Sequence, residues 1–295
     1  MYDIEKTYQP KTIDEAIENL VAEPKAEIIA GGTDVLVKVR EGGLAGATLV
    51  SIHEIPELRG ISMKDDGTIV IKAATCFADI TRDPIIQKNI PTLGKAVDTV
   101  GGPQIREMGT IGGNTCNGVT SADSASTLMA LNAQMEVKGP KGTRIIPITE
   151  WYAGPSKTVR EHDEVLVSVQ ITKDNYEGFH GCYLKYGKRN AMEIATLGCS
   201  VHLKLSDDKK TIADFRVGYG VAGPNPMRCP KTEEKVKGMP LNDDLLETIA
   251  EGALQETKPR NSWRASEAFR RQIIAEFGRR ATAAAINEAG GKLNA

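Results

Sequence analysis

The first third of the chain alternates between the periodicities that distinguish helices from strands. Residues 12–22 carry apolar side chains at spacings of three and four, which predicts an amphipathic helix. Its apolar face consists of Ile13, Ala16, Ile17 and Leu20. Residues 27–30 form a short apolar strand that leads directly into Gly31 and Gly32, and residues 35–40 are expected to be helical. The first diglycine therefore lies at a strand–turn–helix junction, where phosphate groups are often bound. Further strands are expected at residues 48–52 and 68–73.

Residues 101–126 lack this periodicity. They are rich in Gly, Ser, Thr and Asn and carry few bulky apolar side chains. A long ordered loop with a function is expected here, because residues 101–103 (Gly-Gly-Pro) and the diglycine at 112–113 are typical of defined turns. The next expected elements are a hairpin of residues 134–138 and 143–147, and a strand of residues 165–171 with one apolar face.

The last 120 residues have a different order of elements. Strands come first and helices follow, which is typical of an α+β domain. The expected strands are residues 179–186, 196–205 and 214–221, and the expected helices are residues 243–256 and 266–288. We therefore expect a domain boundary near residue 175.

Composition narrows the class of protein. Of the 295 residues, 40% are hydrophobic and 26% are charged, and the net charge of −2 does not favour a nucleic-acid binder. The five cysteines have no CxxC spacing, so neither a zinc site nor an iron–sulfur cluster is expected on this chain. The charged N-terminal residues and the absence of a long apolar run lead us to expect a soluble, cytoplasmic protein.

Common catalytic and nucleotide-binding motifs are missing. The sequence contains no GxGxxG after the first strand, no GxxxxGK[ST] and no HExxH, and its four histidines are far apart. What remains is the two diglycines at 31–32 and 112–113. Consecutive glycines let main-chain N–H groups converge on an anion, but they also serve simply to supply turns. From these residues alone, a structural turn and a nucleotide diphosphate site remain alternatives.

The loops themselves suggest how a diphosphate would be held. Neither contains Lys or Arg, so backbone dipoles would have to neutralise most of the phosphate charge. The hydroxyls of Thr33 and Thr110 and the amide of Asn114 can add hydrogen bonds. Asp34 is a poor phosphate contact and is expected to cap the following helix or to stabilise the turn.

Longer motifs carry a resemblance to a known family. AGGTD at 30–34 and TIGGN at 110–114, with GPQIR between them at 102–106, resemble the FAD-binding subunits of the xanthine dehydrogenase and carbon monoxide dehydrogenase families. The likeness continues through NGVTSADSAS at 117–126, GCYLKYGKRNAMEIATLG at 181–198 and PRNSWRASEAFRR at 259–271. It covers nearly the whole chain and is strongest to the separate flavin subunit of bacterial xanthine dehydrogenases.

This resemblance implies a fold and a set of cofactor contacts. The implied fold is α+β, with a PCMH-type FAD-binding domain at 1–175 (subdomains about 1–57 and 58–175). A C-terminal domain of the CO dehydrogenase flavoprotein type, a three-stranded antiparallel sheet with helices, is implied at 176–295. The implied FAD-binding residues are Glu27, Ile28, Ile29, Ala30, Gly31, Gly32, Thr33, Asp34, Val35, Gly101, Gly102, Thr110, Gly113, Asn114, Asp123, Leu166 and Lys185. Leu166 could equally be a core residue, and Lys185 could be a solvated strand residue.

The implied function is electron transfer within a larger enzyme of purine metabolism. A molybdenum subunit with molybdopterin would oxidise xanthine or a related purine, and an iron–sulfur subunit would pass electrons from 2Fe–2S clusters through FAD to NAD, in a heterotrimer. This chain would bind FAD, and Lys185 could stabilise the reduced, anionic flavin. The alternatives are a stand-alone FAD-dependent oxidase, the flavin subunit of a related hydroxylase for another N-heterocycle or CO, or a subunit without a cofactor.

Two features of the loops bear on their chemistry. Covalent flavin oxidases of the wider superfamily attach FAD through histidine, and no histidine lies near either loop, so a non-covalent flavin is expected. Cys116 lies close to the second loop, where a redox role and a small buried thiol are the two interpretations.

Overall fold

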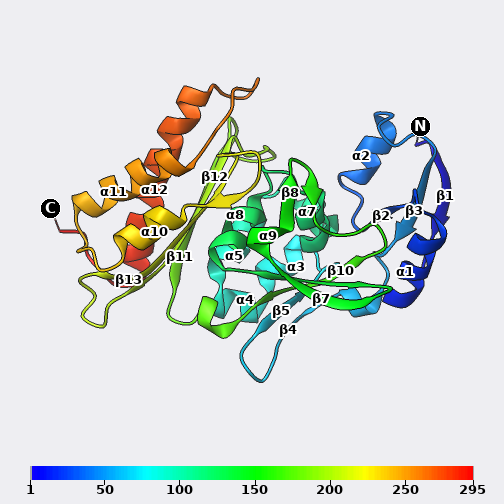
Figure 1. Cartoon of the computed structure of the whole chain (residues 1–295), viewed down its shortest axis with the longest axis horizontal. Coiled ribbons are helices and arrows are strands. Elements are labelled where there is room, and N and C mark those ends of the chain that lie inside the picture. Colours follow the sequence, from blue (N-terminus) through cyan, green and yellow to red (C-terminus); the bar gives the residue numbers. More distant parts are fainter. Residues whose placement is uncertain (1, 295) are drawn as a thin grey trace.

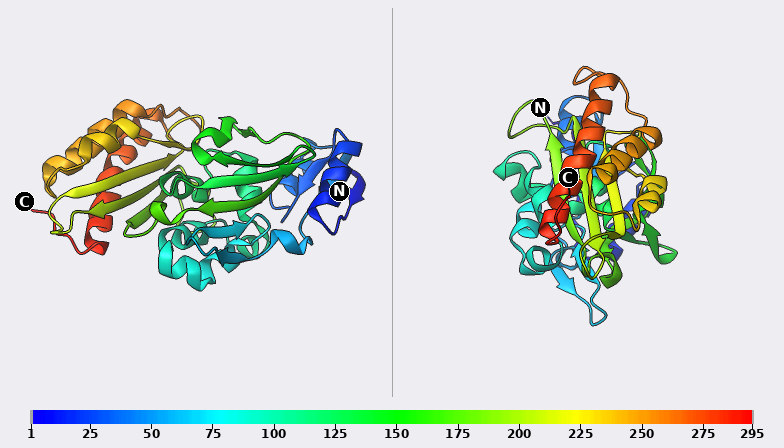
Figure 2. Two further views of the ribbon diagram at one scale, coloured as in Figure 1. Left: turned by 60° about the horizontal axis from the view of Figure 1, so that its bottom comes forward. Right: turned by 90° about the vertical axis from the view of Figure 1, so that its left-hand side faces the viewer.

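The computed structural model describes residues 2–294 and has an α+β fold with three larger sheets and one two-stranded sheet. Figure 1 shows an elongated molecule in which the N-terminal, central and C-terminal sheets follow one another along the long axis. The two ends of the chain lie at opposite ends of the molecule, and the left view of Figure 2 shows the same order. No helix within residues 2–294 combines the length and the apolar composition needed to cross a membrane.

The N-terminal sheet is parallel, with strand order β1-β3-β2. Its elements are β1 (Ile4–Tyr8), α1 (Ile13–Ala22), β2 (Glu27–Ile29), α2 (Val35–Arg40) and β3 (Ala47–Ser51), followed by a 3-10 turn, η1 (Pro56–Leu58). The Thr12 hydroxyl accepts a hydrogen bond from the Glu15 N–H and so caps α1. The apolar face predicted for this helix is confirmed, since its four side chains are all buried. Helix α1 packs against β3 and also contacts the strand β10 (Val165–Ile171) of the central sheet.

The central sheet is antiparallel, with strand order β4-β5-β10-β6-β7. Its strands are β4 (Ile61–Met63), β5 (Ile69–Lys72), β6 (Gln134–Gly139), β7 (Gly142–Pro147) and β10 (Val165–Ile171). The intervening chain forms α3 (Phe77–Arg82), α4 (Pro84–Asn89), α5 (Pro91–Asp98), α6 (Pro103–Met108), α7 (Ile111–Asn117), α8 (Asp123–Ala130), α9 (Ile148–Trp151) and the short pair β8 (Tyr152–Gly154) and β9 (Lys157–Thr158). A second 3-10 turn, η2 (Lys173–Asn175), ends this part.

Two predictions for the central part are wrong. The long loop expected at residues 101–126 is largely helical, because Pro103 begins α6, Thr110 caps α7 and α8 is buried along its whole length. Strand β10 does not have a single apolar face, since all seven of its side chains are buried. It is the middle strand of its sheet, and Ser168 and Gln170 are accommodated by hydrogen bonds to the Glu136 carboxylate.

The C-terminal sheet is antiparallel, with strand order β11-β12-β13-β14. The three predicted strands are β11 (His180–Tyr186), β12 (Leu197–Leu205) and β13 (Ile212–Gly220), and the two-residue β14 (Met227–Arg228) extends them. The helices are α10 (Pro230–Val236), α11 (Asp243–Glu256) and α12 (Glu267–Glu288). The two longer helices agree with the predicted ranges.

The two faces of the C-terminal sheet differ, as the two-residue period of a strand requires. On β12, Cys199, Val201 and Leu203 face the apolar core formed with α11 and α12. The opposite face packs on α5 and α8 with small and polar residues. A Cβ atom on Gly218 would lie 2.2 Å from the Ser126 carbonyl oxygen, so β13 and α8 meet main chain to main chain. This close packing fixes β11 and its side chains relative to the central helices.

His202 is buried at this junction, and its effect on stability can be measured. Burial, assisted by the nearby Arg216, lowers the pKa of His202 to about 3. The folded state therefore keeps this imidazole neutral, while the unfolded chain takes up a proton below its ordinary pKa of about 6.5. Stability contributed by His202 is complete above that pH and is lost as pH falls towards 3, by about 2 kcal/mol at about pH 5. His202→Gln should flatten the difference between unfolding free energies measured in urea at about pH 7.5 and about pH 5. The same difference in variant and wild type would contradict this account.

Candidate functional site

A cavity of about 700 Å³ lies where the N-terminal sheet meets the central helices. Its size is within the range of small-molecule and cofactor sites. Both glycine loops line it, and of the residues predicted to bind a cofactor, twelve are in its wall. These are Glu27, Ile28, Ala30, Gly31, Gly32, Thr33, Asp34, Val35, Thr110, Gly113, Asn114 and Leu166. Segments about 80 residues apart in sequence thus form one site.

The first glycine loop joins β2 to α2. Gly32 has a φ of +73°, a left-handed conformation that favours glycine. Gly31 is required for a different reason, because a Cβ atom there would lie 1.7 Å from the Met108 carbonyl oxygen. The first loop therefore lies directly against the segment that leads into the second. Asp34 occupies the cap position of α2, but the predicted capping role is wrong, because its side chain makes no capping hydrogen bond.

The second glycine loop is the first turn of α7 rather than a separate turn. The Thr110 hydroxyl accepts a hydrogen bond of 3.0 Å from the Gly113 N–H, and the Gly112 N–H donates to the Ala73 carbonyl oxygen. A Cβ atom on Gly112 would lie 2.6 Å from that oxygen, so α7 begins in close contact with the end of β5. At Gly113 an added Cβ atom would lie 3.9 Å from the Ala30 Cβ atom, which shows that the two loops face each other.

Free main-chain donors are concentrated in the first loop. Within residues 2–294, the N–H groups of Gly31, Gly32 and Thr33 donate to no protein acceptor. Such consecutive unpaired donors bind anions, and the N-terminus of α2 adds a partial positive charge. A phosphate group therefore fits this wall of the cavity.

The two ends of the cavity differ in polarity. Beyond the C-terminal end of α7 the wall is basic and polar, and near α6 it is apolar. The basic end contains Lys38, Asn117, Lys157, Thr158 and Arg160, and the apolar end contains Phe77, Val100, Ile105 and Ile194. Such a gradient suits an elongated ligand with an aromatic ring system at one end and polar, anionic groups along the rest.

Sequence reasoning missed the basic residues of this cavity. The Lys38 ammonium group donates to the Asn117 amide oxygen at 3.1 Å, which joins α2 to the end of α7. Lys157 comes from the β8–β9 hairpin, which is held over α7 by a hydrogen bond from the Ser156 N–H to the Gly118 carbonyl oxygen. The absence of Lys and Arg from the glycine loops thus does not leave the cavity without cations. No local sequence signal points to a short hairpin 40 residues beyond the loop.

Asp123 and Lys185 lie close together but outside the cavity wall. The Lys185 ammonium group is 2.8 Å from the Asp123 carboxylate and also donates to the Thr99 carbonyl oxygen at 2.9 Å. The Tyr183 hydroxyl donates to the other carboxylate oxygen at 2.7 Å. Burial raises the pKa of Asp123, and the Lys185 charge and the Tyr183 hydrogen bond oppose that shift. This buried cluster joins β11 of the C-terminal sheet to the start of α8.

A short hydrogen-bond path connects this cluster to the cavity. Ser124, next to Asp123, donates its hydroxyl hydrogen to the Asn114 amide oxygen at 2.6 Å, and Asn114 lines the cavity. The Thr99 carbonyl held by Lys185 directly precedes Val100, which also lines the cavity. The ion pair therefore lies outside the cavity and fixes the positions of Asn114 and Val100, which line it.

Three other residues predicted to bind the cofactor also do not line the cavity: Ile29, Gly101 and Gly102.

Cys116 lines the cavity as a neutral thiol. Burial raises its pKa to about 11, although the Arg160 charge acts in the opposite direction. A thiol with that pKa is a weak nucleophile near neutral pH. The geometry therefore favours the interpretation of Cys116 as a packing residue.

Removing the cap of α7 should weaken ligand binding. Thr110→Val keeps the shape of the side chain but leaves the Gly113 N–H without its acceptor. A lost helix cap costs about 1 kcal/mol, which corresponds to about fivefold weaker binding if the loop must be reordered by the ligand. Equilibrium titration with FAD measures the effect. Thr12→Val removes the equivalent cap of α1, away from the cavity, and should leave FAD affinity unchanged. Equal FAD affinity in both variants would contradict the assigned role of Thr110.

Comparison with known proteins defines the class. Residues 2–173 match the family described as FAD binding domain in molybdopterin dehydrogenase, and residues 182–285 match the CO dehydrogenase flavoprotein C-terminal domain. The chain therefore belongs to the FAD-binding subunits of the molybdenum hydroxylase family. It is 40% identical to a xanthine dehydrogenase FAD-binding subunit of Escherichia coli O157:H7, over 99% of this chain and 100% of the relative.

More distant relatives share the same fold. The chain is 28% identical to the carbon monoxide dehydrogenase medium chain of Hydrogenophaga pseudoflava, over 94% of this chain and 96% of the relative. A solved structure of carbon monoxide dehydrogenase from that organism superposes with a TM-score of 0.91 at 27% identity, covering 97% of this chain and 98% of the other. These comparisons confirm the α+β fold and the family named by the sequence motifs.

Proposed function

We propose that the cavity binds FAD non-covalently, with the diphosphate between the two glycine loops. The unpaired N–H groups of Gly31, Gly32 and Thr33 would hold the phosphates, together with the side-chain amide of Asn114. The path of the cofactor would be lined by Glu27, Ile28, Ala30, Val35 and Leu166. Asp123 and Lys185 would lie outside the cavity and hold its wall in place. No cavity-lining residue within residues 2–294 is a histidine, which fits a cofactor without a covalent bond.

The polarity of the cavity suggests the orientation of the cofactor. The flavin ring would occupy the apolar end beside Phe77, Ile105 and Ile194, next to the C-terminal sheet. The adenosine half would lie toward Lys38 and the β8–β9 hairpin. The chain would thus orient the ring by packing and the diphosphate by hydrogen bonds and charge.

We further propose that the chain is an electron relay between a 2Fe–2S partner subunit and NAD. When bound, FAD can exchange electrons singly with an iron–sulfur cluster and in pairs with a nicotinamide. The supporting observation is the lack of titratable side chains at the apolar end. Those that line the cavity, including Glu27, Asp34 and Lys157, belong to the loop and basic ends. Within residues 2–294, the side chains that line the apolar end therefore include no acid or base to serve an organic substrate at the ring, which argues against a stand-alone oxidase.

In this proposal, substrate oxidation takes place on a separate molybdenum subunit with molybdopterin. The 40% identity to a xanthine dehydrogenase subunit supports xanthine or a related purine as the substrate of the complex, a heterotrimer in the cytoplasm. A related hydroxylase for another N-heterocycle or for CO is the second candidate, supported by the likeness to carbon monoxide dehydrogenase medium chains.

Anaerobic reduction of the purified, flavin-loaded chain tests the relay. NADH should bleach the flavin absorbance of the isolated chain, whereas xanthine and other purines should bleach it only when the molybdenum and iron–sulfur subunits are present. Reduction by a purine without those subunits would show a stand-alone oxidase. Bleaching of the complete complex by a purine but not by NADH would retain the relay and replace NAD by another acceptor.

A further inference from the structure

The exposed large hydrophobic side chains of this protein are unevenly distributed. Of the eleven that are exposed within residues 2–294, six belong to three segments beside the apolar end of the cavity. The segments are α6, the β11–β12 loop and residues 263–269, which lead into and begin α12. We call these six residues the ring-end patch: Ile105, Met108, Met192, Ile194, Trp263 and Phe269. Apolar side chains that gather on a surface mark an interaction site, whereas scattered ones do not.

Contacts between the segments make the patch continuous. Ile105 and Ile194 both line the mouth of the cavity, and Met192 lies against Gly102 at the start of α6. On the other side of the loop, Tyr186 packs edge to face against Phe269, with ring centroids 5.4 Å apart. The Lys188 ammonium group lies 5.3 Å from the centroid of the Trp263 ring. The patch therefore runs from the cavity mouth to the C-terminal helices.

The patch is also basic, in a chain whose net charge is −2. The loops at residues 187–195 and 258–266 contain five basic residues and a single acidic one. The acidic residue, Glu193, is already paired with Arg189 at 2.9 Å. Arg264 stacks on the Trp263 ring, with its guanidinium carbon 4.2 Å from the centroid. The basic residues are Lys188, Arg189, Lys258, Arg260 and Arg264.

This composition is that of a protein interface. Trp, Met, Phe and Arg are enriched in interface cores, and Trp and Arg carry most of the binding energy where it has been measured. Trp263 is 77% exposed, so about three quarters of a large aromatic ring remains in contact with water when the chain is alone. The surrounding cations would attract an acidic surface and repel a basic one.

We propose that the ring-end patch is the docking surface for an acidic face of the protein that exchanges electrons with the flavin, an iron–sulfur subunit. The proposal rests on the proposed relay, because electron exchange requires the partner's cluster to approach the ring, and the patch surrounds the end of the cavity assigned to the ring. Trp263 would be buried in the interface, and Lys188 and Arg264 would pair with partner carboxylates.

The fluorescence of Trp263 can report on docking of the iron–sulfur protein. The chain has two tryptophans, and Trp151 is fully buried, so quenching of fluorescence by acrylamide is due to Trp263. The probe is the iron–sulfur protein that accompanies the affinity-tagged chain from its source cells, identified by its iron content and separated. Titration of this protein into the flavin-loaded chain should protect Trp263 from acrylamide. Affinity should fall as salt concentration rises.

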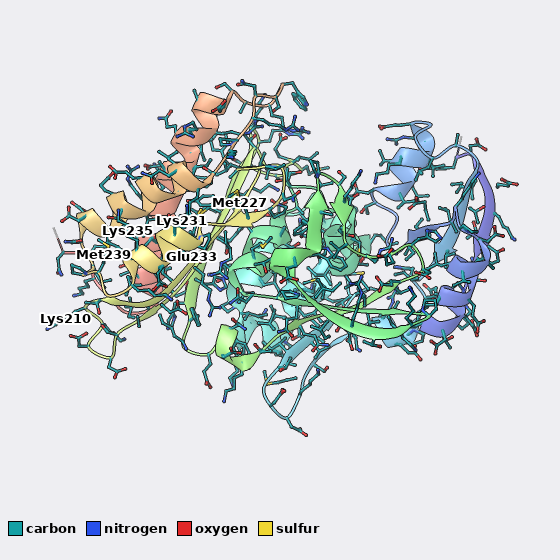
Figure 3. The ribbon with its side chains drawn as sticks, viewed as in Figure 1. Lys210, Met227, Lys231, Glu233, Lys235 and Met239 are labelled. Atoms are coloured by element: carbon teal, nitrogen blue, oxygen red, sulfur yellow. The ribbon has the colours of Figure 1, made fainter. Side chains whose placement is uncertain are left out.

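Charge-reversal variants test the surface with a matched control. The double substitution K188E and R264E should weaken binding of the iron–sulfur protein by about tenfold or more, and W263A should weaken it similarly. The control is K231E with K235E, two exposed lysines on α10 outside the patch (Figure 3). It makes the same change in net charge and should leave affinity unchanged. FAD content should be equal in all variants.

The outcomes separate this proposal from the proposed function. Binding that leaves Trp263 accessible, or that is equally strong in the patch variants, would overturn the docking surface while leaving the relay intact. A raised KM for NADH in K188E/R264E without a change in partner affinity would also overturn it, because the patch would then serve the nucleotide. If no iron–sulfur protein accompanies the flavin-loaded wild-type chain, both the relay and the docking surface fail.

Discussion

Gly31→Ala should abolish most FAD binding while leaving the protein folded. The added methyl group would lie 1.7 Å from the Met108 carbonyl oxygen and 2.5 Å from its carbon. Both are main-chain atoms, so no side chain can rotate away, and the two glycine loops must separate. Overpacking of this kind costs about 1–3 kcal/mol. If binding must reverse the displacement, FAD affinity falls by about tenfold to a hundredfold.

The ratio of flavin to protein after dialysis measures this effect, with circular dichroism as the check on folding. Gly43→Ala is the matched control. Gly43 lies in the turn after α2, and an added Cβ atom would meet only the Lys38 carbonyl oxygen, at an ordinary contact distance of 3.5 Å. It should retain FAD like the wild type. Equal FAD retention by Gly31→Ala would show that the approach of the loops does not shape the cofactor site.

Lys185→Met should cause the largest loss of stability among single substitutions near the cavity. It removes one partner of a buried ion pair and leaves the Asp123 carboxylate enclosed with the Tyr183 hydroxyl as its remaining partner in the cluster. Breaking such a pair costs about 3–5 kcal/mol. Because the pair also holds the Thr99 carbonyl and, through Ser124, the Asn114 side chain, FAD affinity should fall as well. Urea unfolding and FAD titration measure the two effects separately.

The pH dependence of unfolding and a second substitution show whether the buried Asp123 charge causes the loss of stability in Lys185→Met. Burial raises the pKa of Asp123, and loss of Lys185 raises it further. A folded state that binds this proton more tightly than the unfolded state gains stability as pH falls, so the penalty of Lys185→Met should shrink below neutral pH. Adding Asp123→Asn should restore part of the lost stability. Lys173→Met, which breaks an exposed pair with Glu177, should change little. A penalty in Lys185→Met that is independent of pH would contradict the buried-charge explanation.

Local chemistry explains why much of the fold was predictable. Regular apolar spacing identified α1 and the three long strands of the C-terminal sheet. The helices within residues 101–126 were missed because they are short, and because glycine, serine and threonine pack there against main chain rather than forming an apolar stripe. The start of α7 at Thr110 had a readable signal, because Thr is a preferred N-cap residue.

The candidate site likewise contains residues that could be predicted from the sequence and residues that could not. Gly31 and Gly32 stand out in the sequence as a diglycine, and the structure gives each position a reason for glycine: a close approach at Gly31 and a left-handed backbone at Gly32. The ion pair of Lys185 with Asp123 could not be predicted, because the two residues are 62 positions apart and β11 meets α8 only in the tertiary structure. The basic wall at Lys157 depends similarly on where the β8–β9 hairpin comes to lie. Tertiary contacts between distant segments have no periodic pattern in the sequence.

The glycine-loop cavity as the site of a non-covalent flavin is the central claim, and acid precipitation of the purified chain tests it most directly. The protein should be yellow, and precipitation should release its flavin into the supernatant as FAD, one molecule for each chain. Wild-type protein reconstituted with FAD should bind it, and Gly31→Ala should bind it about tenfold to a hundredfold more weakly. Colourless protein that takes up no FAD, or flavin that remains in the precipitate, would contradict the account.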